Sequence, residues 1–447
     1  MMSSASSSSS WSDLKSKVEA TETGLFLLNQ QLLRDKGDGM ANTWANLRLF
    51  GEKEENVRVV FYKDTASWCP YCQKCWILLE EKKIPYKVKR INMRSYGDKP
   101  AEYLKLVPNG LLPAVEIDGK FQTESIDIMF NLDRLFSGPK HPSLWPSRGT
   151  AEDARAQKLM RLERDLFGLW CNLIFRPSFL GSSALRRFEE GLALVNNELS
   201  VTEGPWFLST MSIVDLQFVT HVERMLASCL FWSGLKIRNS GKYPHIDRWF
   251  DAFESRESYM ATKSDYYTHV CDIPPQYGEG YSLPGSASIA SQIIGDEGQW
   301  QLPLPAFDPI NDIEPVSASI DPGEEGARHE AAFKIVANFE NIIKFSLRGV
   351  GKKGAKQFQA PLADPYAVPA LELYNEMESV FKALVSALLQ GSTDIQKIDV
   401  KDTKTINKLV ASLDYFKYRI GVPRDMSYPA ARQLRAYCNH IIQCLNN

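Results

Sequence analysis

The sequence predicts an α/β domain followed by two all-helical regions. Residues 57–62, VRVVFY, form a nearly continuous apolar and β-branched run, which is typical of a strand buried on both faces. From Ala151 to about Tyr267 the apolar residues recur at helical spacing throughout. Four further helix candidates follow at 325–347, 365–390, 403–419 and 428–445. Strand signals are therefore confined to the first third of the chain.

The elements of the α/β domain follow one another in a recognisable order. After the first strand, Pro70 stands where a helix begins, and CQKCWILLEEKK continues it to Lys83. A strand (YKVKRINM), a short helix (PAEYLKL), two strands joined by Asp118-Gly119 (LPAVEID and KFQTE) and a closing helix (SIDIMFNLDRLF) complete the domain. This βαβ-α-ββα order is that of a thioredoxin-like domain, which we expect over residues 56–137.

Composition shifts divide the rest of the chain. The stretch 137–149 has the Pro, Gly and Ser content of a linker, so an all-helical domain is expected over 150–270. Within this domain Ser212 and Asp215 form a helix-capping pattern. Residues 271–324 are rich in Pro, Gly, Ser and acidic residues and are interpreted as a linker on the surface. The helix candidates after it predict an antiparallel bundle over 325–447.

The N-terminal residues 1–55 are predicted to be an extension that is partly disordered. Its Ser-rich start, MMSSASSSSSW, favours a disordered tail, and a remnant of a targeting peptide is the alternative. Eight cysteines, mostly inside apolar helical runs, indicate a reducing compartment. We therefore expect a cytoplasmic protein, with the plastid stroma as the second candidate.

Charge and hydropathy exclude two classes of partner. The formal net charge is −2, and no run of Lys or Arg is dense enough to follow a phosphate backbone, so a nucleic-acid partner is not expected. No apolar stretch approaches the ~20 residues that a bilayer span requires, so no membrane association is expected.

Three cysteines at intervals of three, in SWCPYCQKCW, fit a redox centre, a metal site or a buried core. Cys69 follows a buried strand and precedes a helix, where unpaired N–H groups and the helix dipole favour a thiolate. Cys72 lies one turn further in, placed to attack a mixed disulfide on Cys69. A metal site needs a fourth ligand, and the next cysteine, Cys171, belongs to another domain. We therefore predict catalytic Cys69 and Cys72, no metal, and a buried, inert Cys75.

The motif Cys69-Pro70-Tyr71-Cys72 resembles the active site of glutaredoxins, and residues 57–267 resemble a glutathione transferase. The use of a catalytic cysteine is similar to that in the omega class of glutathione transferases. The complete arrangement resembles the iota class of photosynthetic organisms, which combines a dithiol motif with a long C-terminal extension. The resemblance implies a thioredoxin-like α/β domain, an all-α transferase C-terminal domain and an additional all-α bundle.

The same resemblance implies a glutathione site. In Asn109-Gly110-Leu111-Leu112-Pro113, the Leu112 backbone before cis-Pro113 would pair with the cysteinyl backbone of glutathione. Glu124 and Ser125 would receive the amino and carboxylate groups of the γ-glutamyl end. Lys99 aligns with the omega-class lysine that meets the glycine carboxylate.

Cys72 stands where the omega class has an apolar residue, so dithiol chemistry becomes available. Phe167, Trp170 and Ile174 share one helical face and are candidates for a hydrophobic co-substrate site, although a core role is favoured for at least two of them. The resemblance also allows a homodimer.

The expected function is a glutathione-dependent thiol transferase or deglutathionylase that acts on glutathionylated or disulfide substrates, with minor glutathione-conjugating activity. The alternative is a non-catalytic scaffold that binds glutathione or an iron–sulfur cluster and whose C-terminal bundle binds a partner. The basic loop 349–356 is interpreted as a solvated loop rather than a phosphate site.

Overall fold

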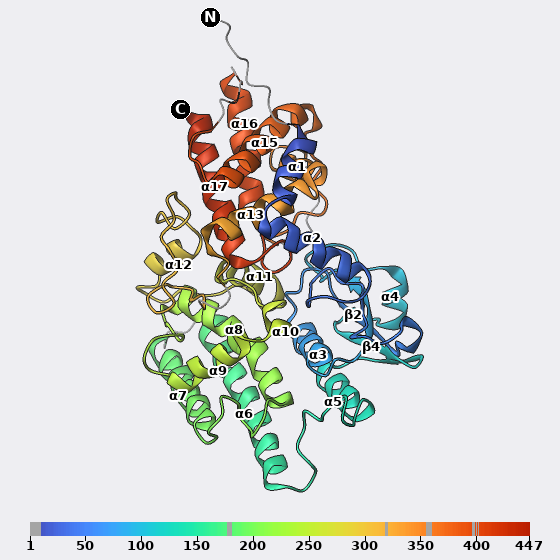
Figure 1. The fold of residues 1–447 in the computed structure, drawn as a ribbon. Helices are drawn as coiled ribbons and strands as arrows, with labels where there is room; N and C mark the ends of the chain where they lie inside the picture. Colours follow the sequence, from blue (N-terminus) through green and yellow to red (C-terminus); the bar gives the residue numbers. More distant parts are fainter. Residues whose placement is uncertain are drawn as a thin grey trace, which may run out of the picture. The chain divides into compact units, whose positions relative to one another are not determined.

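The computed structural model describes residues 10–176, 181–317, 321–354, 360–395, 398, 400 and 402–447 (Figure 1). The chain divides into two compact units. The first unit comprises residues 1–31, 295–306 and 321–447, and the second comprises residues 32–294 and 307–320. The second unit contains the cysteine motif.

The second unit opens with a five-stranded mixed sheet in the order β1-β3-β2-β4-β5. Strands β2 and β3 are parallel, and the other neighbouring pairs are antiparallel. The elements are β1 (Leu47–Arg48), β2 (Val59–Asp64), α3 (Pro70–Glu81), β3 (Tyr86–Ile91), α4 (Ala101–Leu106), β4 (Ala114–Ile117), β5 (Lys120–Gln122) and α5 (Ser125–Leu135). This confirms the predicted thioredoxin-like order and adds β1, which is too short to give a sequence signal.

Helices cover both faces of this sheet. Phe61 and Val59 of β2 are fully buried in one core cluster together with residues of α3 and α5. Tyr62, which points to the opposite face because strand side chains alternate, packs in a second cluster with Tyr103 of α4. Burial on both faces is the physical reason that β2 reads as an almost continuous apolar run.

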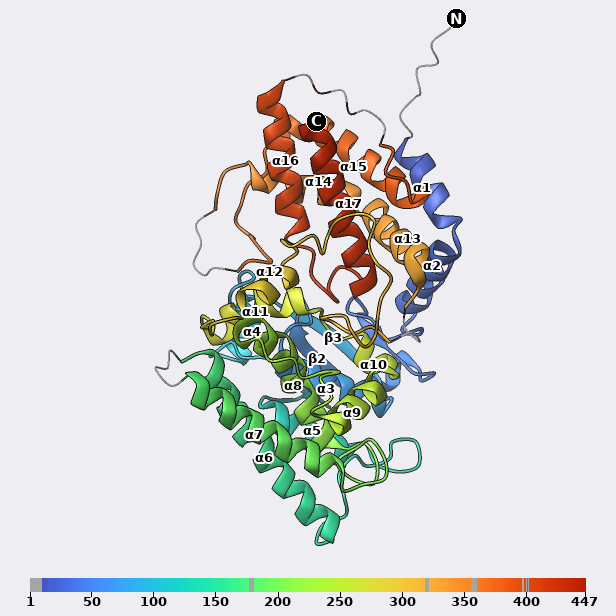
Figure 2. The ribbon, with the colours of Figure 1, turned by 90° about the vertical axis from the view of Figure 1, so that its left-hand side faces the viewer.

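The remainder of the second unit is helical. Its helices are α6 (Ala151–Ile174), α7 (Gly181–Leu199), α8 (Ile213–Ser233), α9 (Pro244–Glu254), α10 (Glu257–Met260), α11 (Tyr266–Tyr277) and α12 (Ala287–Ile293). Figure 2 shows α6 and α7 side by side, as their mutual packing requires. The predicted capping of α8 is confirmed, because Asp215 accepts hydrogen bonds from the N–H and the hydroxyl of Ser212, both at 2.9 Å.

The segment 271–324 differs from the surface linker expected. It begins with the last turns of α11, contains α12, and buries Ile293, Trp300 and Val316. Spaced apolar residues anchor this segment although its overall composition is that of a connector.

The first unit is a helical bundle. It contains α1 (Trp11–Glu19), α13 (Gly323–Val336), α14 (Phe339–Ser346), α15 (Tyr374–Gln390), α16 (Thr403–Lys417) and α17 (Tyr428–Asn446), and α2 (Glu22–Asp35) starts in this unit. Two predicted helices require correction. The candidate 325–347 is interrupted at Asn338, whose backbone is not helical. In the candidate 365–390 the α-helix begins only at Tyr374, after Pro365, Pro369 and a short 3-10 helix at Leu371–Leu373.

The N-terminal extension is largely helical from Trp11 onward. A capping box between Ser10 and Asp13 starts α1, and Leu14 and Val18 are buried in the bundle core. The bundle thus includes chain from both ends of the sequence. The Ser-rich residues 1–9 and part of the loop 349–356 lie outside the described residues. No described helix is long and apolar enough to cross a bilayer.

Candidate functional site

The cysteine motif lies at the N-terminus of α3, as the sequence predicts. Cys69 is the N-cap residue with an extended backbone, and Pro70 occupies the first helical position. The Sγ atom of Cys69 lies 3.9 Å from the carbonyl oxygen of Leu112, and the Leu112–Pro113 peptide bond is cis. The structure therefore brings Cys69 together with the loop that the sequence assigned to glutathione.

The two motif cysteines differ only slightly in how much of each residue is exposed to solvent. Cys69 is 6% exposed and Cys72 is 2% exposed. Burial raises the pKa of the Cys72 thiol well above its ordinary value, and the neighbouring Cys69 sulfur raises this pKa further. Cys72 is consequently held as a neutral thiol in the reduced protein.

Cys75 has the inert character that the sequence predicts. Its side chain is fully buried, and burial raises the pKa of its thiol to about 12. The Sγ atom donates to the carbonyl oxygen of Ser125 at 3.4 Å, which joins α3 to the start of α5. The role of Cys75 is therefore packing rather than redox chemistry.

A carboxylate caps the peptide that carries Cys69. Asp64, at the end of β2, is fully buried, and its Oδ2 atom accepts from the amides of Trp68 at 2.6 Å and Cys69 at 3.3 Å. Lys63, which is 1% exposed, donates to the Asp64 carbonyl oxygen at 3.2 Å and to the Ser67 hydroxyl at 2.8 Å. Ser67 itself has φ of +65°, a strained conformation for a residue with a Cβ. These contacts fix the turn between β2 and α3.

Helices α8 and α11 hold the same turn from its other side. The guanidinium group of Arg224 donates to the carbonyl oxygen of Trp68 at 2.5 Å and to the side chain of Gln73 at 2.9 Å. Gln276 donates to the Trp68 carbonyl oxygen at 3.4 Å and also to Asp272. The buried Asp272 carboxylate accepts from the Tyr96 hydroxyl at 2.5 Å. These residues escaped the sequence analysis, because their contacts exist only in the folded structure.

Asp272 is expected to make stability depend on pH. Burial raises its pKa from 3.8 to about 7, so the folded protein holds a proton that the unfolded chain releases. This contribution is full below pH 4 and is lost as the pH rises through 7. The free energy of unfolding of the wild type should fall by about 2–3 kcal/mol more than that of Asp272→Asn between pH 5 and pH 8.

Urea unfolding at both pH values measures this difference. Glu279→Gln, at an exposed carboxylate two residues beyond α11, is the matched control and should keep the wild-type pH dependence. Equal slopes for the wild type and Asp272→Asn would show that Asp272 is ionised in the folded protein at pH 5.

The residues predicted for the γ-glutamyl end lie at the start of α5. Ser125 is the first helical residue, and Glu124 is the N-cap, with an exposed side chain and φ of +65°. The N–H groups at the start of α5 can bind the negative group of a ligand, and the exposed Glu124 carboxylate can bind its positive group. The strained backbone of Glu124 is typical of residues at ligand sites. Cys75 links this helix start to α3, so both predicted parts of the site share one framework.

Lys99 lies nearby but is engaged within the protein. Its ammonium group donates to the carbonyl oxygen of Asn92 at 2.6 Å. Its side chain packs against Gly110, where an added Cβ atom would lie 3.1 Å from the Lys99 Cδ atom. Burial lowers the pKa of Lys99. Reaching a glutathione carboxylate would require Lys99 to exchange its bond to Asn92.

The candidate co-substrate residues of α6 are mostly core, as favoured from the sequence. Trp170 and Ile174 are fully buried, and the Trp170 indole donates to the Ser228 hydroxyl at 2.8 Å. Phe167 is partly buried and packs 4.8 Å from the His221 ring, measured between centroids.

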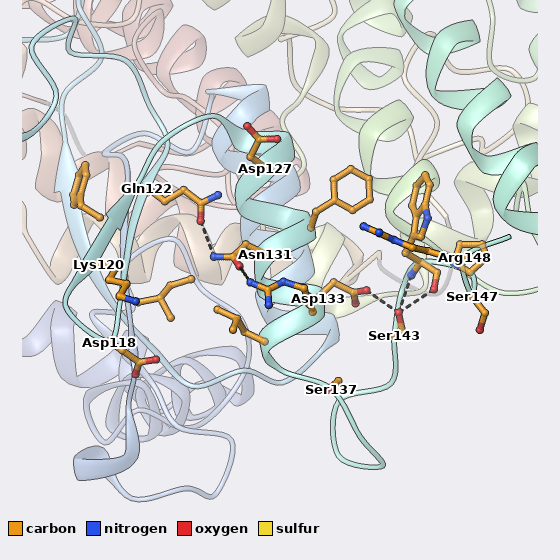
Figure 3. A pocket seen from close by; sticks show the side chains of 17 residues that line it. Asp118, Lys120, Gln122, Asp127, Asn131, Asp133, Ser137, Ser143, Ser147 and Arg148 are labelled. Carbon is orange, nitrogen blue, oxygen red and sulfur yellow. Dashed lines mark hydrogen bonds between the residues drawn. The ribbon is translucent and has the colours of Figure 1, made fainter.

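A cleft of about 970 Å³ lies beside α5, β5 and the 137–149 segment (Figure 3). Its lining mixes acidic, basic and amide side chains, and Asn131 donates to Gln122 at 2.8 Å within it. None of the predicted catalytic or glutathione residues lines this cleft. Its lining therefore adds nothing to the thiol chemistry. In the part of the chain that the structure describes, no three His, Cys, Asp or Glu side chains gather as a metal-ligand set.

Known proteins resemble the part of the chain that contains the cysteine motif. The glutathione S-transferase N-terminal domain profile matches residues 68–135, which include Cys69 and Ser125. Glutathione S-transferase L3 of Arabidopsis thaliana is 28% identical over 204 residues, which cover 45% of this chain and 81% of that protein. Glutathione S-transferase DHAR2 of Arabidopsis thaliana is 27% identical over 207 residues, covering 45% and 86%. The solved omega 3C glutathione transferase of Trametes versicolor is 23% identical, covers 54% of this chain and 92% of its own, and has a TM-score of 0.40.

Proposed function

Because the chain belongs to the glutathione S-transferase superfamily, whose members are glutathione-dependent enzymes, we propose that it is a glutathione-dependent thiol transferase with Cys69 as the nucleophile. The observation that carries the proposal is the position of Cys69 at the N-terminus of α3, with Sγ 3.9 Å from the Leu112 carbonyl oxygen. A thiol transferase needs its nucleophilic sulfur beside the backbone that holds the peptide part of glutathione.

The proposed reaction is thiol–disulfide exchange. The Cys69 thiolate attacks the glutathione sulfur of a glutathionylated substrate, and the substrate thiol leaves. A second glutathione then reduces the mixed disulfide on Cys69, or Cys72 attacks the Cys69 sulfur and releases glutathione. Conjugation of electrophiles is secondary, because a cysteine captures glutathione as a disulfide instead of only activating its thiol.

Mass spectrometry after incubation with oxidised glutathione tests the nucleophile directly. The Cys72→Ser variant should carry one glutathione adduct, located on Cys69 by peptide mapping, because the internal exit is closed. An adduct confined to another cysteine would contradict the proposal.

Glutathione affinity is expected to depend on Glu124 and Ser125, since each is proposed to meet a charged group of the γ-glutamyl end. Ser125→Ala should weaken binding by about 1–2 kcal/mol, the scale of a hydrogen bond to a charged group. Isothermal titration calorimetry measures this loss. Asp127→Asn, which changes an exposed carboxylate in the same helical turn, is the matched control and should bind as the wild type does. Unchanged affinity in both Ser125→Ala and Glu124→Ala would show that the site lies elsewhere.

Three narrower expectations stay predictions. They are the assignment to the iota class, the cytoplasmic location and the homodimer. The helical bundle of the first unit contains none of the residues proposed for catalysis or glutathione binding.

A further inference from the structure

A cavity of about 550 Å³ lies in the second unit, where the N-terminal extension meets strand β3. Its volume is within the range of about 300–1,000 Å³ that is typical of small-molecule sites. None of the residues predicted for thiol chemistry or glutathione binding lines it. The lining residues come from the end of α2, from the loop and strand β1 that follow, and from β3, and they are Arg34, Asp35, Trp44, Asn46, Leu47 and Arg90.

The guanidinium group of Arg90 carries a charge that its protein partners do not neutralise. It donates to the side-chain oxygen of Asn46 at 2.5 Å and to the carbonyl oxygens of Thr43 at 3.3 Å and Ala45 at 3.0 Å. Its Nε atom is buried and has no hydrogen-bond partner among the described residues. All three acceptors are neutral. A partly buried cation without a counter-charge is unfavourable, so an anion in the cavity would stabilise Arg90.

A second guanidinium group, that of Arg34, lines the same cavity. Burial lowers the pKa of Arg90, and the positive charge of Arg34 lowers it further, so the two groups are close enough to repel each other. The adjacent Asp35 accepts from the Nε and Nη2 atoms of Arg34 at 3.2 and 3.1 Å. The Asp35 side chain is 63% exposed, and such a pair contributes little in water. The lining therefore has an excess of positive charge.

The indole of Trp44 is presented by a loop that the sheet holds in place. The Trp44 amide donates to the Asn42 side chain at 2.7 Å, and the Val88 amide of β3 donates to the Asn46 carbonyl oxygen at 2.8 Å. Trp44 is 41% exposed, and its ring centroid lies 5.2 Å from the Arg90 guanidinium carbon. A partly exposed indole beside a cation offers a planar ligand group a surface on which to stack.

We propose that this cavity binds a small molecule that joins a phosphate group to a planar ring, with a nucleoside monophosphate as the representative ligand. The phosphate lies between the guanidinium groups of Arg34 and Arg90, and the ring stacks on Trp44. A planar carboxylate is satisfied by one guanidinium fork, whereas a tetrahedral phosphate accepts hydrogen bonds from several directions. Two guanidinium groups that come from α2 and β3 therefore favour phosphate. The site goes beyond the proposed function, because none of its residues takes part in the thiol chemistry.

Isothermal titration calorimetry of the full chain with AMP, adenosine and inorganic phosphate separates the two contacts. AMP should bind with a Kd of about 1 mM or tighter. Adenosine and inorganic phosphate should each bind at least about tenfold more weakly, because each keeps only one of the two contacts. Trp44→Ala should weaken AMP binding at least about fivefold, the scale of one stacked base, and should leave the affinity for inorganic phosphate unchanged.

Two neighbouring substitutions should change the affinity in opposite directions. Arg34→Met should weaken AMP binding at least about tenfold, the scale of a lost hydrogen bond to a charged group. Arg34 is replaced rather than Arg90, because Arg90 also holds the loop and Arg34 bonds only to Asp35. Asp35→Asn should tighten AMP binding, because it removes a carboxylate that competes for Arg34. Arg186→Met, which removes an exposed cation of α7, is the matched control and should bind AMP as the wild type does.

Several results would overturn the assignment. The phosphate contact is refuted if AMP does not bind, if adenosine binds as tightly as AMP, or if Arg34→Met keeps the wild-type affinity. Equal affinities for inorganic phosphate and AMP would refute the ring contact, and with it the nucleotide. Loss of AMP binding in Ser125→Ala but not in Arg34→Met would place the nucleotide in the proposed glutathione site. The proposed function stands or falls separately, by the glutathione adduct on Cys69.

Discussion

Replacing Cys69 with serine is expected to abolish turnover on glutathionylated substrates. The exchange reaction needs a sulfur that forms a mixed disulfide at the start of α3, and serine cannot form one. Cys72 cannot substitute, because it is 2% exposed and burial holds it as a neutral thiol. Release of thiol from a glutathionylated peptide, followed spectroscopically, measures the loss.

The other two cysteines are expected to respond differently. Cys72→Ser closes the internal exit but leaves glutathione able to release the product, so deglutathionylation should persist while reduction of protein disulfides falls. Cys75→Ser should preserve both activities and lower stability by about 1 kcal/mol, because the Cys75 sulfur only packs and bonds to Ser125. A metal site would instead make all three substitutions destabilise the fold together. Full activity of Cys69→Ser would refute the mechanism.

The sheet domain could be predicted from the sequence because its signals are local. A buried strand, Pro70 at a helix start and the Asp118-Gly119 turn each fix an element by their own chemistry, and the structure places these elements as expected. The pairing of Cys69 with the Leu112–Pro113 loop also followed from the sequence, through the resemblance. The sheet elements could be predicted because each depends on a few residues adjacent in the chain, whereas this pairing joins residues 43 positions apart and came from the resemblance alone.

The surroundings of the motif could not be predicted, because they depend on distant segments. Arg224 and Asp272 follow Cys69 by more than 150 residues, and neither stands in a local pattern that indicates a site. The polar Lys63-Asp64 pair is visible in the sequence at the end of an apolar strand, but only the fold shows that the Asp64 carboxylate accepts from the Cys69 amide. In the bundle, Pro365 and Pro369 indicate that the helix starts after them, but the helical spacing of the apolar residues led to a predicted start at 365 instead of Tyr374.

Arg224→Met is expected to lower the free energy of unfolding by about 3–5 kcal/mol and to reduce turnover at least tenfold. The Arg224 side chain is 1% exposed and bonds to the carbonyl oxygens of Trp68 and Thr220 and to Gln73. Methionine of similar length keeps much of the packing but leaves these acceptors unpaired inside the protein. It also removes a positive charge that lowers the pKa of Asp272, against the larger effect of burial, which raises it.

The loss of turnover has a separate cause from the loss of stability. Trp68 directly precedes Cys69, and Arg224→Met removes the 2.5 Å bond to its carbonyl oxygen, so the reacting sulfur is held less firmly. Arg58→Met is the matched control on the same sheet domain, since the Arg58–Asp118 pair is about half exposed and should contribute less than about 1 kcal/mol. Urea unfolding gives the first quantity, and single-turnover deglutathionylation of the folded fraction gives the second. If Arg224→Met unfolds as readily as Arg58→Met and reacts at the wild-type rate, α8 does not position the nucleophile.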